Sequence, residues 1–230
     1  DKHLLSLKDL NQSEELEALL DAGASSFKIE GRLKDVSYVK NVTAAYRQKL
    51  DAILARRKEY VRASSGSCRY AFNPQLDKSF SRGFTHYFLH GRTRDVFSFD
   101  TPKSLGEEMG TMKEARGNYL TVAGLKSFNN GDGVCYIDEQ GKLQGFRINR
   151  VEGNKLPRIK PRTVLYRNFD QEFEKILARR SSERKMAVAI RLADTAFGFA
   201  LTLTDEDDNR VTLSLPRAKE PARTPQEENL

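Results

Sequence analysis

Three charged side chains near the N-terminus have the chemistry of an acid–base site. Glu30 is a carboxylate able to exchange a proton or to orient a neighbouring group. Lys28 falls on the same side of an extended chain as Glu30, because successive side chains of a strand alternate between faces. Lys8 follows an earlier apolar run. We predict Glu30, Lys28 and Lys8 as catalytic residues. The alternative is a network of ion pairs with a purely structural role.

Three further residues beside them have the properties of a substrate-binding group. Arg32 presents a planar fork that pairs with a carboxylate or a phosphate. Gly31 allows the backbone to turn tightly or to approach a ligand closely. Asp9 directly follows Lys8. We predict Arg32, Asp9 and Gly31 as substrate-binding residues.

A basic strip lies far downstream, in residues 147–167, where Glu152 is the single acidic residue. Such a strip is able to follow a phosphate backbone. The alternative is a solvated edge whose charges prevent aggregation. The predicted RNA-binding residues are Arg147, Arg150, Lys155, Arg158, Lys160, Arg162 and Arg167.

The elements that must position the first group lie in residues 1–57, which read as strand, helix, strand, helix. Residues 3–7 form a short apolar run, and residues 26–30 alternate between apolar and polar side chains, which is the periodicity of a strand. Asp35 is a candidate cap for a helix that extends to residue 57. We predict the last two βα units of a TIM-like barrel, with Lys8, Glu30 and Arg32 at one rim because functional side chains follow the carboxyl ends of barrel strands.

The fold class predicted for the whole chain is α/β plus all-β. Residues 58–105 are an irregular aromatic linker, and closely spaced short strands with Gly and Asn turns in residues 106–168 indicate a small β-barrel. Residues 169–215 predict a helix and a β-meander that opens a further β-rich domain. Residues 216–230 hold prolines and many charges, so we predict a disordered tail.

Composition narrows the classes of protein and cofactor. The formal net charge of +7 permits a nucleic-acid partner. No apolar run approaches the roughly 20 residues of a membrane helix, so we expect no membrane partner and a cytoplasmic location. Cys68 and Cys135 have no ligand-like spacing. His86 and His90 are four residues apart but lack the intervening acid of zinc peptidases, so we predict no metal site and no cofactor in this chain.

Several motifs together resemble peptidase family U32, the collagenase-like peptidases. Residues 26–34 read Ser-Phe-Lys-Ile-Glu-Gly-Arg-Leu-Lys, Tyr38-Val39 and Tyr46-Arg47 follow, and Arg82-Gly83-Phe84-Thr85 comes later. The Gly131-Asp132-Gly133 turn is similar to one in the small β-barrel of the family, which itself resembles the second domain of elongation factors. The resemblance implies a barrel that begins upstream of Asp1, an internal piece that is inactive alone, and an iron–sulfur cluster held by cysteines in the upstream part.

The function implied by the resemblance is hydroxylation of a pyrimidine in tRNA or rRNA, with this chain as an RNA-binding part. The alternative is a collagenase-like peptidase acting on peptides, and a third hypothesis is a scaffold module. The sequence contains neither the Gly-x-Ser-x-Gly motif of a serine hydrolase nor the His-Glu-x-x-His motif of a zinc peptidase. The residues therefore favour RNA over peptide as the substrate, while the oligomeric state is left open.

Overall fold

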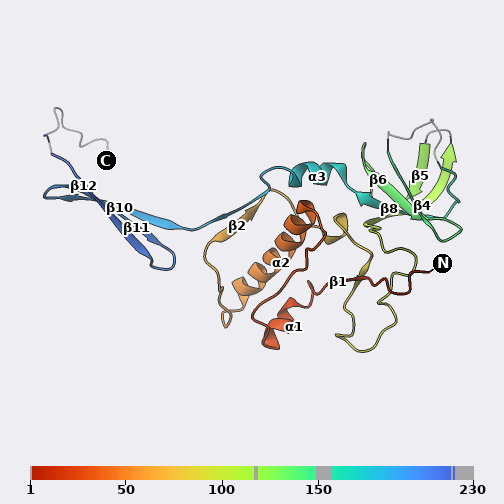
Figure 1. Cartoon of the computed structure of the whole chain (residues 1–230), viewed down its shortest axis with the longest axis horizontal. Helices are drawn as coiled ribbons and strands as arrows, with labels where there is room; N and C mark the ends of the chain where they lie inside the picture. The colour runs from red at the N-terminus through yellow and green to blue at the C-terminus, as the bar shows by residue number, and fades with distance from the viewer. Residues whose placement is uncertain (1, 117–118, 149–156, 219, 221–230) are drawn as a thin grey trace. The chain divides into compact units, whose positions relative to one another are not determined.

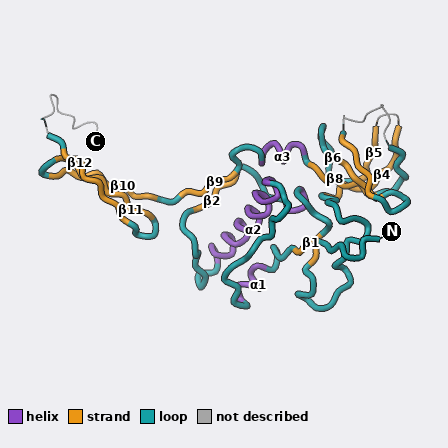
Figure 2. The backbone as a smooth tube through the Cα atoms, in the orientation of Figure 1, coloured by secondary structure: helices purple, strands orange, loops and turns teal. Residues whose placement is uncertain are grey.

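The structure is a computed structural model that describes residues 2–116, 119–148, 157–218 and 220. The chain forms two compact units. Unit 1 comprises Asp1–Tyr60 and Tyr70–Ser182, and unit 2 comprises Val61–Arg69 and Glu183–Leu230. Figures 1 and 2 follow the elements along the chain. Each unit is described by itself.

Two helices form the N-terminal part of unit 1. The first is α1 (Leu16–Asp21), and the second is the long helix α2 (Val36–Arg56). The predicted cap of the second helix is confirmed, because the Asp35 side chain accepts a hydrogen bond of 2.7 Å from the Tyr38 backbone amide. The Asn11 side chain accepts a hydrogen bond of 3.0 Å from the Ser13 amide, just before α1 begins.

One face of α2 packs against the end of unit 1. Ala44 is fully buried there, in a cluster with Phe72, Phe173 and Leu177. The last two belong to α3 (Gln171–Leu177), which is capped at its N-terminus by Asp170. Lys40 of α2 donates to the carbonyl of Leu177 at 2.6 Å and so satisfies the carbonyl end of α3. These contacts hold α2 and α3 together within unit 1.

The two predicted barrel strands are not formed as such. The alternating residues 26–30 belong to an irregular segment, and residues 3–7 contribute only an isolated bridge from Leu7 to Phe97. Instead β1 (Asp9–Leu10) pairs in parallel with β3 (Phe84–Thr85). A parallel strand requires a neighbour that supplies backbone partners, and the described residues offer none to residues 26–30. The barrel itself therefore stays a prediction.

A five-stranded antiparallel sheet follows, in the order β5-β4-β8-β6-β7. Its strands are β4 (Glu107–Arg116), β5 (Tyr119–Ala123), β6 (Gly133–Ile137), β7 (Leu143–Arg147) and β8 (Val164–Phe169). The buried core contains Met112, Val134, Tyr136, Ile159 and Leu165. Among the described residues β5 and β7 are edge strands, so closure into a barrel stays a prediction.

One glycine of this sheet allows a close approach of two strands. Gly110 has φ +127, and a Cβ at this position would lie 2.1 Å from the Ala123 carbonyl oxygen. The register of β4 shifts between Glu108 and Gly110, which marks a bulge. Only glycine fits this bend without moving the neighbouring strand.

Unit 2 contains the predicted meander. The strands β10 (Val188–Thr195), β11 (Gly198–Asp205) and β12 (Arg210–Pro216) form an antiparallel sheet in that order. A separate two-stranded sheet is formed by β2 (Ser67–Tyr70) and β9 (Ser182–Lys185). The helix predicted near the start of residues 169–215 is α3, and the strand β9 follows it. Most of the predicted tail lies outside the described residues.

Among the described residues, no helix combines the length and the apolar character needed to cross a membrane. The predicted irregular linker, residues 58–105, contains β2, the short 3-10 helix η1 (Leu76–Lys78) and β3. The domain boundaries proposed from the sequence remain predictions.

Candidate functional site

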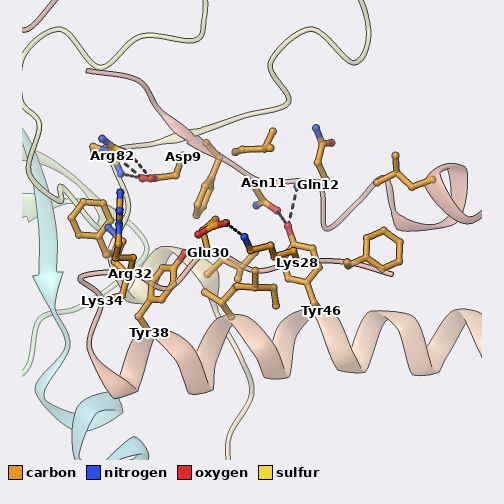
Figure 3. Close-up of a pocket in the computed structure, with 18 residues that line it drawn as sticks. Asp9, Asn11, Gln12, Lys28, Glu30, Arg32, Lys34, Tyr38, Tyr46 and Arg82 are labelled. Carbon is orange, nitrogen blue, oxygen red and sulfur yellow. Dashed lines mark hydrogen bonds and ion pairs between the residues drawn. The ribbon is translucent and has the colours of Figure 1, made fainter. Parts of the chain in front are cut away.

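A pocket of about 640 Å³ lies in unit 1 between α2 and segments from both sides of this helix in the sequence (Figure 3). This volume is in the range of small-molecule sites. It is lined by residues 9–12, Leu19 of α1, residues 27–34, a half-buried to buried side of α2 (Tyr38, Val42 and Tyr46), and residues 76–84. The first and last stretches are held side by side by the parallel pairing of β1 with β3.

An ion pair between Asp9 and Arg82 stands at one end of the pocket (Figure 3). The Arg82 Nη2 atom donates to Asp9 Oδ1 at 2.7 Å, and the Arg82 backbone amide donates to Asp9 Oδ2 at 2.8 Å. Both side chains are about three-quarters buried, with exposed fractions of 26% for Arg82 and 23% for Asp9. Asp9 therefore orients the guanidinium of Arg82 at the pocket.

A second feature at this end is a cluster of cations around an aromatic ring. The Lys34 Nζ atom lies 3.0 Å from the centroid of Phe80, and the Arg82 guanidinium carbon lies 5.5 Å from the same centroid. Burial lowers the pKa of Lys34; Asp9 opposes this shift and Arg82 adds to it. Within the described part of the chain, neither Arg32 nor Lys34 forms an ion pair, so both cations are available to an anionic ligand.

The predicted catalytic pair Lys28 and Glu30 lies on the exposed side of the pocket. Lys28 Nζ and Glu30 Oε1 are 2.9 Å apart, and the two side chains are 86% and 75% exposed. The hydrogen bond from Lys28 and its charge lower the pKa of Glu30; burial opposes this shift, and the charge of Arg32 adds to it. The hydrogen bond to Glu30 raises the pKa of Lys28. Glu30 is therefore a carboxylate at neutral pH, suited to accept a proton or a hydrogen bond.

Two tyrosines of α2 also line the pocket. Tyr46 accepts a hydrogen bond of 3.0 Å from the Gln12 amide and lies 3.3 Å from Asn11 Oδ1. Burial raises the pKa of Tyr38, and the charge of Asp9 raises it further. Burial also raises the pKa of Tyr46. Both phenols therefore keep their protons at neutral pH.

The structure brings four of the predicted site residues together at the pocket: Asp9, Lys28, Glu30 and Arg32. Lys8 is not among the lining residues and pairs with Asp95. Gly31 adjoins the pocket, but an added Cβ would meet only Val39 at an ordinary 3.5 Å. The common rim of Lys8, Glu30 and Arg32 stays a prediction.

Sequence reasoning missed several lining residues as members of the site. Arg82 and Phe80 were assigned to an aromatic linker, and Lys34 and Tyr38 were noted only within a family motif. The signal available for Arg82 was the Arg-Gly-Phe-Thr stretch, which resembles the family but says nothing of its spatial neighbours. The pairing of β1 with β3 is what places it opposite Asp9.

The basic strip of the sheet is described only in part. Arg158 and Arg162 are exposed, and Lys160 pairs with Glu139 at 2.7 Å. Arg147 lies 4.0 Å from the centroid of Phe169. Arg150 and Lys155 fall outside the described residues.

Arg167 must be removed from the predicted RNA-binding set. Its side chain is 7% exposed and contacts three carboxylates: Nε is 3.0 Å from Glu107 Oε2, Nη1 is 3.2 Å from Asp132, and Nη2 is 3.4 Å from Asp170. Burial lowers the pKa of Arg167, but the hydrogen bond to Glu107 and these charges outweigh it and raise the pKa. A guanidinium enclosed by three acids is not available to a phosphate.

Comparison with known proteins identifies relatives of this chain. The family model described as Peptidase family U32 matches residues 1–96. The 23S rRNA 5-hydroxycytidine C2501 synthase of Escherichia coli (strain K12) is 42% identical over 229 residues, which cover 94% of this chain and 35% of that protein. The chain therefore spans about a third of the length of this relative.

Two further relatives carry different names. The tRNA hydroxylation protein P of Escherichia coli (strain K12) is 26% identical over 165 residues, covering 66% of this chain and 33% of that protein. A protein of Porphyromonas gingivalis named Collagenase is 31% identical over 168 residues, covering 66% of this chain and 41% of that protein. No solved structure matches significantly.

Proposed function

We propose that this chain, which belongs to peptidase family U32, is part of an enzyme that hydroxylates a pyrimidine base of RNA. The likeness to the rRNA hydroxycytidine synthase extends over 94% of the chain. Because the chain spans 35% of that relative, we propose that it supplies RNA contacts and one wall of the active site, and that catalysis requires the remainder.

The observation that carries this proposal is the cationic and aromatic end of the pocket. Arg32, Lys34 and Arg82 present positive charge there, and the Phe80 ring lies under two of these cations. Lys and Arg neutralise the phosphates of RNA, and aromatic rings stack on its unpaired bases. We therefore propose that a single-stranded nucleotide enters the pocket with its phosphate at Arg32 and Lys34.

The remaining residues of the pocket take roles consistent with this orientation. We propose that Glu30 accepts a hydrogen bond or a proton from the base and that Lys28 holds its carboxylate ionised, as their 2.9 Å contact allows. Asp9 positions Arg82, and Tyr38 is a protonated donor at the same end of the pocket. The exposed Arg158 and Arg162 are proposed as further phosphate contacts on the sheet.

The iron–sulfur cluster implied by the family resemblance does not fit the cysteines of this chain. Such clusters are held by thiolates. Burial raises the pKa of the Cys135 thiol to about 12, so it keeps its proton. The other cysteine, Cys68, belongs to unit 2 and is half-buried. We derive no reaction step through a cluster and propose that any cluster uses cysteines outside this chain.

The proposal is tested by measuring the affinity of a short fluorescent RNA with an unpaired pyrimidine loop. Removing Arg32 and Lys34 together (Arg32→Ala with Lys34→Ala) should weaken RNA binding by at least about tenfold. The slope of log K against log salt should fall in size by about 1.4, because each lost phosphate contact to a single strand accounts for about 0.7. The matched control removes two exposed lysines outside the pocket, Lys58→Ala with Lys103→Ala, and should leave both quantities nearly unchanged. Equal losses in both double variants, or no RNA binding at low salt, would refute the proposal.

The second candidate is peptide hydrolysis, favoured by the likeness to the protein named Collagenase. The residues that line the pocket include no serine, cysteine or histidine, so a nucleophile with its base is not found there. Cleavage of gelatin by the full-length parent, abolished by Glu30→Gln, would establish this candidate in place of the first.

A further inference from the structure

Three potential metal ligands from two distant segments meet beside α1. The side chains of Glu15, His86 and His90 each offer one donor atom, and these atoms all lie within 4.8 Å of one another. The His90 Nε2 atom is 3.0 Å from Glu15 Oε1. The two imidazole rings meet edge to face, with centroids 5.7 Å apart. Sequence spacing alone does not reveal this group, because its acid lies 75 positions from His90.

The backbone around these ligands is held by contacts that do not involve the ligands' donor atoms. The Asn11 amide donates to the Thr85 carbonyl at 3.0 Å, which continues the pairing of β1 with β3 up to His86. The histidines then flank a tight turn, closed by a 3.3 Å bond from the Leu89 amide to the His86 carbonyl. This turn, rather than a helix, brings the rings of residues 86 and 90 to one side.

Gln12 contacts His86 in two ways and so orients it. Its Nε2 atom donates to the His86 carbonyl at 3.2 Å, and its Oε1 atom lies 3.4 Å from His86 Nδ1. An amide oxygen accepts hydrogen bonds, so this contact favours the proton on Nδ1 and leaves the lone pair of Nε2 free. Metal-binding histidines are commonly fixed by such a partner on the other ring nitrogen.

We propose that Glu15, His86 and His90 bind a divalent transition-metal ion, with Zn²⁺ as the representative ion. Two imidazoles and a carboxylate are a ligand set that Zn²⁺ accepts. Ligands about 2.1 Å from a tetrahedral ion are about 3.4 Å apart, so donor atoms spread over up to 4.8 Å need only a small closing movement. Both histidines are exposed, which permits it. Three protein ligands leave one coordination position open to water or substrate.

The site differs from the cationic end of the pocket, although Gln12 contributes to both the pocket lining and the orientation of His86. Its ligands play no part in the proposed RNA contacts. Loss of RNA affinity and loss of metal binding are therefore separable results.

The test is calorimetric titration of the full chain, without an affinity tag, with Zn²⁺. One ion should bind per chain. Loss of a residue that only orients a metal ligand typically costs roughly 10- to 100-fold in metal affinity. The variants His86→Ala, His90→Ala and Glu15→Gln remove a ligand itself, so each should weaken Zn²⁺ binding by at least this factor. Gln12→Ala should weaken it within that range. The matched control His3→Ala removes the remaining histidine, and Cys68→Ser removes the half-buried thiol; neither should change the affinity.

A second measurement identifies the ligands directly. X-ray absorption at the zinc edge should show nitrogen and oxygen at about 2.0–2.1 Å and no sulfur near 2.3 Å. The exposed side chain of His90, at 64%, makes its replacement compatible with folding, and circular dichroism verifies this. Absence of saturable Zn²⁺ binding, binding unchanged in both His90→Ala and Glu15→Gln, or a zinc–sulfur shell would overturn the proposal.

Discussion

Replacing Arg167 by alanine separates a structural arginine from an RNA-binding one. The substitution removes a guanidinium that is 7% exposed and leaves three buried carboxylates close together. Glu107 keeps Lys126 at 2.7 Å, and Asp170 keeps Lys78 at 2.7 Å. Asp132, which is fully buried, keeps only backbone donors among the described residues, the amides of residues 129 and 171.

The expected loss of stability depends on which of the three acids keep another positively charged partner. Removing one partner of a buried ion pair typically costs 3–5 kcal/mol, because the other charge stays buried without its counter-ion. Two of the three acids here retain a lysine, so we expect a loss near the lower end, about 3 kcal/mol in the free energy of unfolding. Combining Arg167→Ala with Asp132→Asn should cost less than the two single changes added together, since the neutral amide no longer needs the guanidinium.

The assay is equilibrium denaturation by urea, followed by far-ultraviolet circular dichroism. Arg158→Ala is the matched control, since it removes the same charge from an exposed position of unit 1 and should change stability by no more than about 0.5 kcal/mol. RNA affinity, measured well below the unfolding transition, should fall for Arg158→Ala and stay unchanged for Arg167→Ala. A loss of stability no larger than that of the control, together with weakened RNA binding, would show that Arg167 contacts RNA.

Two further predictions concern the stability of unit 1. Burial opposes ionisation of Glu107 and Asp170, but hydrogen bonds from Lys126 and Arg167 to Glu107, and from Lys78 to Asp170, lower both pKa values. The two carboxylates therefore contribute fully to the free energy of unfolding above their unfolded-state pKa values of about 4.3 and 3.9, and this contribution is lost as the pH falls below them. Urea midpoints should drop over this acid range, and less steeply in Glu107→Gln. Separately, Asp35→Ala removes the 2.7 Å cap of α2 and should cost about 1 kcal/mol, whereas Asp35→Asn should retain most of it; equal losses in both would exclude capping as the cause.

The elements predicted well from the sequence are those whose signal is local. The helix after Asp35 has its cap and apolar spacing within a few residues, and its observed bounds, Val36–Arg56, agree with the prediction. The meander strands of residues 188–216 were likewise predicted from the local sequence. These patterns describe interactions among near neighbours, which the sequence shows directly.

The failures concern partners that lie far away along the chain. In residues 26–30 the burial of the side chains alternates, with Phe27 and Ile29 half-buried and Glu30 exposed, yet no strand forms. Alternation shows which side of a segment is covered but not whether another backbone lies beside it. For the same reason charge alone assigned Arg167 to RNA, because two of the three acids that enclose it, Glu107 and Asp132, lie 60 and 35 positions away along the chain.

The short parallel ladder between β1 and β3 has a consequence for how the protein folds. Both the Asp9–Arg82 contact, 73 positions apart, and the Glu15–His90 contact, 75 positions apart, require this closure. Joining such distant segments costs chain entropy before any contact compensates it. We expect α2 to form early from local interactions and the binding surfaces to assemble last, so a newly made chain would acquire its ligand affinity only at the end of folding.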